Sequence, residues 1–259
     1  MLADLAWLGL DFDGAPVLQS QRLDLYRAAF ERLRTAGRVY PCFCTRSEIA
    51  RAVSAPHGLA DEGPRYPGTC LTLSPEQAGE RVRTRPPAWR FRPREGVTEF
   101  HDLLHGMLLQ DVACEVGDFV VLRNDGVPSY QLAVVVDDAE LGITHVLRGD
   151  DLLGSTPRQM QLCEALGLPV PVYAHVPLLL GPDGKRLAKR AGTPSLAELR
   201  ERGIPPERLV GLLAAWAGLG DGRPVALRTL VPRFVLDRLP RQPITVDPAR
   251  VNEGLFGPR

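Results

Sequence analysis

Long apolar runs are missing from this sequence of 259 residues, and none approaches the roughly 20 residues needed to cross a bilayer. Its first residues, MLADLAWLGLDFD, are acidic and lack the positive region that opens a secretory signal. These absences argue against a membrane-spanning or secreted protein, so we expect a cytoplasmic location. Neither sign of charge is in excess, since 31 Lys and Arg balance 31 Asp and Glu. Neutral charge neither requires nor excludes a polyanionic partner.

Cysteine is scarce, and the sequence has neither an internal repeat nor a low-complexity tract. The 25 Gly and 24 Pro are scattered as punctuation between periodic segments, so disorder is not expected. The five cysteines are an odd count, and Cys42 and Cys44 are only two positions apart. This spacing suits metal ligation better than a disulfide framework in a reducing compartment.

Helical periodicity and capping patterns are clear at several places. Apolar residues at helical spacing predict a helix that begins after a cap at Ser20 and ends at Gly37. The capping boxes TRSE at 45–48 and SPEQ at 74–77 each predict the start of a further helix. STPRQMQLCEALG predicts a helix that ends at Gly167.

Short apolar segments between these helices predict strands. They are VYPCFC, AWRFRP, DFVVLR, GITHVLRGDD and HVPLLLG, of which the last two read as buried. Because strands alternate with helices, the sequence predicts an α/β fold with a parallel, doubly wound sheet. Ligands of such sheets bind beyond the carboxyl ends of the strands, where RGDD and the basic stretch GKRLAKR both fall.

The basic stretch is the first candidate site. Lys185, Arg186, Lys189 and Arg190 lie within six positions, behind the turn GPDG. Such a run is either a solvated face or a loop that places cations on a triphosphate during phosphoryl or nucleotidyl transfer. No Walker A pattern occurs in the sequence, which argues against a P-loop enzyme.

The cysteines form the second candidate site. Cys42, Cys44 and Cys70 can supply three thiolates to zinc, and His57 lies between the pairs as a chemically ordinary fourth ligand. The alternative is a set of buried, reduced cysteines without metal. Cys114 and Cys163 lie outside the pattern, and we expect both to be buried and inert.

Weaker patterns admit two interpretations each. Arginines interleaved with Trp89 and Phe91 suit phosphates and stacked bases, or a salt-bridged surface. They are Arg81, Arg83, Arg85, Arg90, Arg92 and Arg94. HDLLH at 101–105 lacks the Glu of a zinc-protease motif, so two ordinary histidines are expected. Paired acids such as Asp137 and Asp138 are more typical of caps and turns than of a magnesium site.

Three ordered motifs resemble the class I aminoacyl-tRNA synthetases. RLAKR at 186–190 is similar to a degenerate KMSKS signature, and residues 127–159 resemble the core of the glutamate and glutamine branch. CFC at 42–44 with YPGTC at 66–70 resembles the glutamyl-queuosine tRNA(Asp) synthetases, which are short paralogues of glutamyl-tRNA synthetase without its anticodon-binding domain. The resemblance covers nearly the whole chain.

This resemblance implies roles for individual residues. Tyr130 and Arg148 match positions that hold glutamate, and Tyr66 matches the fourth ligand of one structural Zn²⁺, with Cys42, Cys44 and Cys70. The ATP-binding loop would consist of Arg186, Leu187, Ala188, Lys189 and Arg190. Of these, Lys189 would be catalytic, stabilising charge on the phosphates of ATP, which binds with Mg²⁺. The partners implied are glutamate, ATP and tRNA(Asp) that carries queuosine, bound by a monomer.

The family also suggests how the chain divides. We assign 1–40 to the remainder of the first half of the nucleotide-binding fold and 41–115 to a zinc-binding, acceptor-like insert. Residues 116–192 form the second half, with the KMSKS-like loop, and 193–259 a small helical appendage. A HIGH-type signature on the first strand and helix is absent from the sequence. We therefore expect an N-terminally truncated, Rossmann-like sheet that is unstable or inactive without upstream residues.

The implied reaction is ATP-dependent activation of glutamate as glutamyl-adenylate, followed by transfer to the queuosine base in the tRNA(Asp) anticodon. Two alternatives stay open. One is an inactive, zinc-bearing RNA-binding remnant, and the other is a fragment of an ordinary glutamyl-tRNA synthetase. The CxC…YxxxC pattern and the short C-terminal part argue against the fragment.

Overall fold

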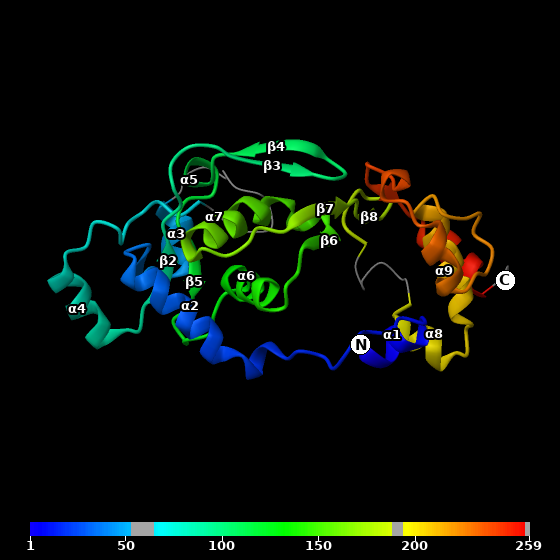
Figure 1. Cartoon of the computed structure of the whole chain (residues 1–259), viewed down its shortest axis with the longest axis horizontal. Coiled ribbons are helices and arrows are strands. Elements are labelled where there is room, and N and C mark those ends of the chain that lie inside the picture. Colours follow the sequence, from blue (N-terminus) through cyan, green and yellow to red (C-terminus); the bar gives the residue numbers. More distant parts are fainter. Residues whose placement is uncertain (53–64, 188–193, 257–259) are drawn as a thin grey trace.

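The computed structural model describes residues 1–52, 65–187 and 194–256. The molecule is elongated, with a sheet-bearing body at one end and a helical C-terminal region at the other (Figure 1). None of the helices in these three ranges is both long and apolar enough to cross a membrane.

The elements within the described ranges follow one another as strands and short helices. The strands are β1 (Val39–Cys42), β2 (Ala88–Phe91), β3 (Thr98–Asp102), β4 (Gly106–Gln110), β5 (Phe119–Leu122), β6 (His145–Gly149), β7 (Val172–Val176), β8 (Leu179–Leu180) and β9 (Ile244–Thr245). The α-helices are α1 (Leu2–Trp7), α2 (Leu23–Thr35), α3 (Arg46–Ala52), α4 (Pro75–Thr84), α5 (Val112–Glu115), α6 (Tyr130–Glu140), α7 (Thr156–Leu166), α8 (Leu196–Glu201), α9 (Pro206–Trp216), α10 (Leu227–Leu230) and α11 (Pro248–Phe256). Short 3-10 turns are η1 (Gln19–Gln21), η2 (Asp150–Ser155), η3 (Val231–Arg233) and η4 (Leu236–Arg238).

Three of the predicted strands form a sheet of their own. β1, β2 and β5 lie in the order β1-β2-β5, and both pairings are antiparallel. The prediction of one parallel sheet is therefore wrong for these strands. Periodicity could not reveal this, because alternation along a strand carries no information about the direction of its neighbour.

The second sheet is mixed, in the order β4-β3-β7-β6. β3, β7 and β6 run parallel, whereas β4 folds back on β3 as an antiparallel hairpin. The connection from β6 to β7 passes through η2 and α7, so these elements form a β-α-β unit. The mixed α/β class with parallel strands is thus confirmed, with a smaller parallel part than the sequence predicts.

One apolar core joins α2, α6 and α7 to the antiparallel sheet. Its fully buried members are Leu33, Phe91, Val112, Val121, Leu132 and Leu162. Polar side chains also fix this packing, because the buried Asp137 carboxylate of α6 accepts hydrogen bonds from Tyr26 and Arg22 on the side of α2. The helices α6 and α7 are therefore held on the antiparallel sheet by a buried apolar core.

β6 is not the buried strand that the sequence predicts. Among the described strands it pairs only with β7, and Leu147 in its centre is 54% exposed. The run HVPLLL likewise forms two short strands, β7 and β8, separated by Pro177 and Leu178. Proline lacks the N–H group that would continue the hydrogen-bonded ladder, which explains the interruption.

The capping patterns predicted the helices well. In SPEQ, the Ser74 Oγ accepts from the Gln77 N–H at 3.3 Å, and the Gln77 side chain accepts from the Ser74 N–H at 2.9 Å, which confirms a helix from Pro75 to Thr84. α7 ends at Gly167, which adopts a left-handed φ of 62° as predicted. Ser20 does not cap α2, because it lies in a 3-10 turn and the helix begins at Leu23.

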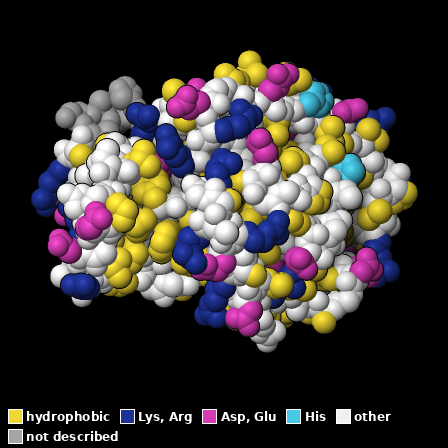
Figure 2. All heavy atoms as spheres, turned by 60° about the vertical axis from the view of Figure 1, so that its left-hand side comes forward, with side chains coloured by type: hydrophobic (Ala, Val, Ile, Leu, Met, Phe, Trp, Pro, Cys, Tyr) yellow, Lys and Arg dark blue, Asp and Glu magenta, His cyan; other side chains and the backbone are white. Residues whose placement is uncertain are grey.

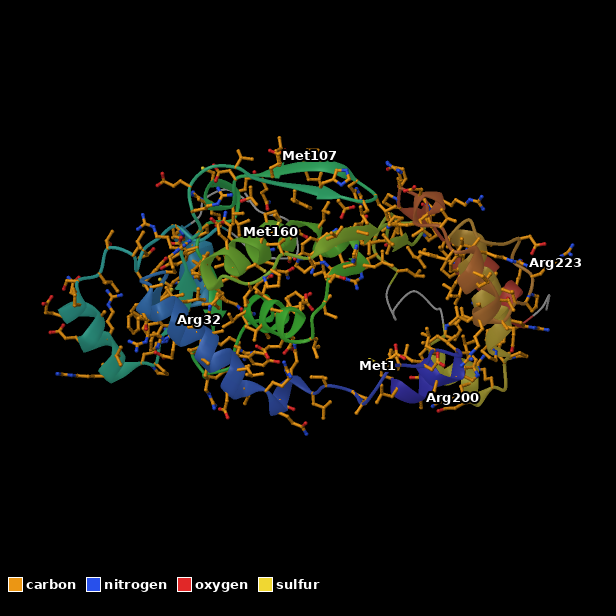
Figure 3. The ribbon with its side chains drawn as sticks, viewed as in Figure 1. Met1, Arg32, Met107, Met160, Arg200 and Arg223 are labelled. Carbon is orange, nitrogen blue, oxygen red and sulfur yellow. The ribbon has the colours of Figure 1, made fainter. Side chains whose placement is uncertain are left out.

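The segment 194–256 is largely helical and contains α8, α9, α10 and α11. Its apolar core includes Leu199, Leu209 and Leu255, and Trp7 and Leu8 near the N-terminus pack against it. Asp4 of α1 pairs with Arg200 of α8 at 2.7 Å, and Figure 3 shows Met1 and Arg200 in this contact region. The N-terminal helix α1 therefore packs against the helical C-terminal region.

Candidate active site and metal centre

Arg148, near the end of β6, is held by four hydrogen bonds. Its Nε donates to His175 Nε2 at 3.0 Å, and Nη1 donates to Gln159 Oε1 at 2.9 Å. Nη2 donates to Thr156 Oγ1 at 2.8 Å and to the Leu152 carbonyl at 3.2 Å. These bonds use four of the five N–H donors of a guanidinium. The arginine fork is therefore fixed in one orientation, and its positive charge remains to act on an anion.

Asp102 and His175 lie behind this arginine. Both side chains are fully buried, and Asp102 Oδ2 lies 2.6 Å from His175 Nδ1. Burial lowers the pKa of His175 below its ordinary value, although the hydrogen bond to Asp102 opposes this shift. Burial alone would raise the pKa of Asp102, but hydrogen bonds from His175 and from the N–H groups of Leu104 and His105 hold it below its usual range.

Tyr130 begins α6, directly after the cap residue Ser129. Its side chain is 47% exposed and lines a groove of about 1420 Å³. Arg148 lies over the ring of Tyr173 at 5.3 Å, and burial raises the pKa of that phenol. Arg148 is not among the residues that line the groove, and the glutamate-binding roles of Tyr130 and Arg148 stay predictions.

The groove carries several arginines along its walls. They are Arg46, Arg65, Arg85, Arg90, Arg123 and Arg158. The groove extends from Tyr130 to the cysteines Cys42 and Cys44. In the space-filling view, Lys and Arg side chains run down the middle of the face, beside an apolar surface (Figure 2). The charge of this overall neutral chain is thus unevenly distributed.

The basic loop is described up to Leu187. Leu187 donates its N–H to the Leu179 carbonyl at 2.8 Å, so the loop turns back along β8. Arg186 Nη1 lies 2.7 Å from Asp151 Oδ2, which joins the loop to RGDD. The two sequence motifs expected at strand ends therefore meet. Ala188, Lys189 and Arg190 lie outside the described residues.

The paired acids have structural surroundings. Asp137 is occupied by Gln19, Arg22 and Tyr26, and burial, followed by the hydrogen bond to Asp137, raises the pKa of Tyr26 to about 12. Tyr26 consequently stays protonated and donates to the carboxylate. Asp138 has its pKa raised by burial. Both acids lie within α6 and not at a cap or in a turn, so that part of the prediction is wrong, and Asp137 is held by protein side chains.

The cysteines of the second candidate site converge as their spacing predicts. The sulfur atoms of Cys42, Cys44 and Cys70 all lie within 4.8 Å of one another. The Tyr66 hydroxyl lies 3.4 Å from Cys42 Sγ and 3.6 Å from Cys44 Sγ, and Cys44 Sγ lies 3.5 Å from Cys70 Sγ. His57 lies outside the described residues.

These separations fit a tetrahedral zinc ion. With Zn–S distances of about 2.3 Å, two ligand sulfurs of a tetrahedron lie roughly 3.8 Å apart. The backbone N–H of Phe43 donates to Cys70 Sγ at 3.4 Å, as expected of groups that orient metal ligands. Arg90 donates its Nε to Cys42 Sγ at 3.2 Å, and its guanidinium lies 3.8 Å from the centre of the Tyr66 ring. A positive charge thus faces the ligand set.

Three minor predictions can now be assessed. Phe91 is fully buried against Phe119, so it is not available to stack on a base, and that interpretation of the basic segment is wrong for it. Cys114 is exposed, contrary to prediction, whereas Cys163 is buried as predicted. HDLLH lies at the end of β3 and in the following turn, not on a helix.

Sequence reasoning missed most of the residues around Arg148. Thr156 and Gln159 were visible only as members of a helix, and Asp102 only as part of HDLLH. His175 was visible only as the first residue of the predicted strand HVPLLLG. Arg148 lies near the carboxyl end of a predicted strand, but β3 was not predicted. The strand order that brings the three residues together is not visible in the sequence.

Comparison with known proteins supplies the family. Residues 1–219 match the family described as tRNA synthetases class I (E and Q), catalytic domain. The chain is 51% identical to a protein named Glutamyl-Q tRNA(Asp) synthetase from Symbiobacterium thermophilum, over 99% of this chain and 82% of that protein. A protein of the same name from Nocardia farcinica is 50% identical, over 93% and 75%.

Solved structures agree with this match. The structure of the glutamate tRNA ligase from Elizabethkingia meningosepticum, in complex with its amino acid, superposes with a TM-score of 0.77 at 25% identity. The match covers 97% of this chain and 57% of that chain. The chain thus spans less than two thirds of that enzyme. Fold and sequence define a catalytic domain of the class I tRNA synthetases for glutamate and glutamine. Within that class, the chain belongs to the glutamyl-Q tRNA(Asp) synthetase family.

Proposed function

We propose that this protein activates glutamate with ATP and transfers it to the queuosine base in the anticodon of tRNA(Asp). In the first step, a carboxylate oxygen of glutamate attacks the α-phosphorus, the bond to pyrophosphate breaks, and glutamyl-adenylate forms. The observation that carries the proposal is the Arg148 guanidinium, fixed by four hydrogen bonds near the carboxyl end of a parallel strand. The names of relatives that are 51% and 50% identical support the acceptor.

Arg148 and Tyr130 hold glutamate in this proposal. The guanidinium of Arg148 can attract a carboxylate with its positive charge and with its one remaining N–H donor, on Nη1. The half-exposed Tyr130 hydroxyl can donate to a carboxylate or accept from an ammonium. The ATP loop is Arg186, Leu187, Ala188, Lys189 and Arg190, with Lys189 on the phosphates and Mg²⁺ as the companion ion. The ion pair of Arg186 with Asp151 supports the placement of this loop beside RGDD.

The arginine-lined groove is the proposed contact surface for tRNA. Arg46, Arg85 and Arg123 line it together with Tyr130, so a phosphate backbone that follows the groove would reach one of the two proposed glutamate-binding residues. Lys and Arg contacts to phosphates supply most of the sequence-independent affinity for nucleic acids. Salt should therefore weaken tRNA binding, which a titration of affinity against salt concentration measures.

We also propose one structural zinc per chain, held by Cys42, Cys44, Cys70 and Tyr66. The three sulfurs and the phenol oxygen have separations close to those of a tetrahedron around zinc, and Arg90 offsets the negative charge of the ligands. Zinc would cross-link β1 to the segment that contains Tyr66 and Cys70, where a small cluster offers little apolar surface to bury. Elemental analysis and the X-ray absorption of bound zinc, with three sulfurs and one oxygen, test this.

Glutamate-dependent exchange of pyrophosphate into ATP, without tRNA, is the decisive test of the first step. We expect exchange with glutamate and little with aspartate, whose carboxylate is one methylene closer to the backbone. Transfer is then measured with labelled glutamate on tRNA(Asp) with and without queuosine. Loss of exchange with retained binding of zinc and tRNA would instead support an inactive RNA-binding remnant. Charging of tRNA(Glu) would support a fragment of a glutamyl-tRNA synthetase.

A further inference from the structure

Three neighbouring parallel strands each contribute one polar residue to a continuous line of hydrogen bonds. Asp102 ends β3, His175 lies in β7, and Arg148 lies in β6. Arg148 and His175 are direct partners across the β6–β7 ladder, and Asp102 is paired in register with Tyr173, two residues before His175. The sheet itself therefore places the three side chains in order, from the buried Asp102 to the partly exposed Arg148.

The hydrogen-bond chemistry of this line fixes the state of His175. Arg148 Nε can only donate, so His175 Nε2, at 3.0 Å, must accept. The ring proton then lies on Nδ1, which donates to Asp102 Oδ2 at 2.6 Å. If the imidazole were protonated, Nε2 of His175 would also carry a proton. Two N–H donors and two positive charges, one of each on His175 and on Arg148, would then face each other. The geometry thus requires a neutral histidine between a carboxylate and a guanidinium.

The surroundings of His175 reinforce this state. Asp102 also accepts from the N–H groups of Leu104 at 2.9 Å and His105 at 3.0 Å, so the carboxylate is itself held in place. His105 Nε2 lies 3.2 Å from the His175 carbonyl, and Asp150 acts electrostatically on both histidines. Tyr173 stacks on the imidazole, with 6.1 Å between the ring centroids. The ionisable groups that face His175 are therefore Asp102, His105, Arg148, Asp150 and Tyr173.

We propose that His175, oriented by Asp102, is the positioning residue that fixes the guanidinium plane of Arg148 for the carboxylate of glutamate. This inference rests on the proposed function, because it takes Arg148 to hold the substrate. His175 lies behind the arginine and is fully buried, so it acts on binding only through Arg148. Buried polar groups of this kind contribute more to a defined geometry than to stability, since their desolvation offsets much of their attraction.

Two substitutions separate positioning from simple packing. His175→Gln places an amide oxygen near the position of Nε2 and can still accept from Arg148. His175→Asn places its amide near Nδ1 and leaves Arg148 Nε without an acceptor. We expect the KM for glutamate in the exchange reaction to rise about ten- to a hundredfold in H175N. This is the change in affinity that corresponds to the loss of one hydrogen bond to a charged group. In H175Q the rise should be less than about threefold, and the KM for ATP should stay constant in both.

Nitrogen NMR of the unsubstituted protein tests the same inference without any variant. Long-range proton–nitrogen spectra distinguish the two neutral tautomers and the imidazolium, and we expect a protonated Nδ1 and a bare Nε2 for His175 at neutral pH. A protonated Nε2 would overturn the proposal even if both variants failed to fold.

The remaining outcomes are also distinct. If glutamate-dependent exchange is present but the glutamate KM of folded H175N is unchanged, positioning by His175 is wrong and the proposed function stands. Equal losses in H175N and H175Q, for ATP as well as glutamate, would show a merely structural role. Absence of glutamate binding to the unsubstituted protein by calorimetry would overturn both proposals together.

Discussion

The cysteine cluster and the Arg148 network are both polar clusters beside sheets, yet they are completed in different ways. Around Arg148, donors and acceptors match, with His175, Gln159 and Thr156 each facing a particular nitrogen. The cysteine cluster instead gathers sulfur and phenol groups that offer weak hydrogen bonds to one another. In the Arg148 network, protein groups fill most of the hydrogen-bonding capacity, whereas the cysteine cluster consists of groups that can bind a cation.

The largest expected effect comes from removing one metal ligand. Cys70→Ser should reduce bound zinc from about one per chain to near zero and expose the segment around Tyr66 to proteolysis, because zinc contributes on the order of several kcal/mol to such small units. Elemental analysis and limited proteolysis measure the two outcomes. Cys114→Ser, at an exposed cysteine, is the matched control and should keep its zinc. If zinc content is the same in both variants, the cluster is a set of reduced thiols.

A second, smaller effect should be confined to the other site. Arg148→Lys keeps the charge but loses the planar fork, so we expect kcat/KM for glutamate to fall roughly a hundredfold with zinc content unchanged. Arg94→Lys is the control, because Arg94 forms an exposed ion pair with Glu164. Steady-state exchange kinetics and elemental analysis are measured on the same samples. A parallel loss of zinc in R148K would show that the two sites are not independent.

Arg90 tests whether the cysteine cluster has a charged partner of its own. Its Nε faces Cys42 Sγ, and its guanidinium covers the Tyr66 ring. Arg90→Met should weaken zinc affinity about tenfold, within the range known for groups that support metal ligands. Competition with a chromophoric chelator measures this affinity. Unchanged affinity in a folded variant would show that Arg90 serves packing alone.

How much could be predicted differs between the two regions for a physical reason. The proposed zinc ligands lie between residues 42 and 70, and the spacing of Cys42 and Cys44 pointed to them, whereas Tyr66 was assigned only from the family resemblance. Asp102 and His175, which share a hydrogen bond, are 73 residues apart, and only the order β3-β7-β6 brings them together. Local spacing is visible in a sequence, but strand order and direction depend on packing across the whole fold.

The same limit explains where the fold prediction succeeded and failed. Capping boxes at Ser74 and Thr45 marked helix starts because the hydrogen bonds they form span only three residues. Burial of β6 was predicted wrongly, because an apolar strand such as HVLRG does not reveal whether one or two neighbours cover it. Local chemistry was therefore more predictable than long-range pairing.

The smallest expected effect is a dependence of stability on pH that arises in the Arg148 network. Burial lowers the pKa of His175 from 6.5 in the folded state, so below that pH the unfolded chain binds a proton that the folded chain does not. The free energy of unfolding should therefore fall as the pH drops below about 6.5, and the lowered pKa of Asp102 should extend this loss at more acid pH. Urea unfolding from pH 7.5 to 5 measures the slope. His175→Gln, which cannot titrate, should flatten it, whereas an unchanged slope would assign the dependence to other groups.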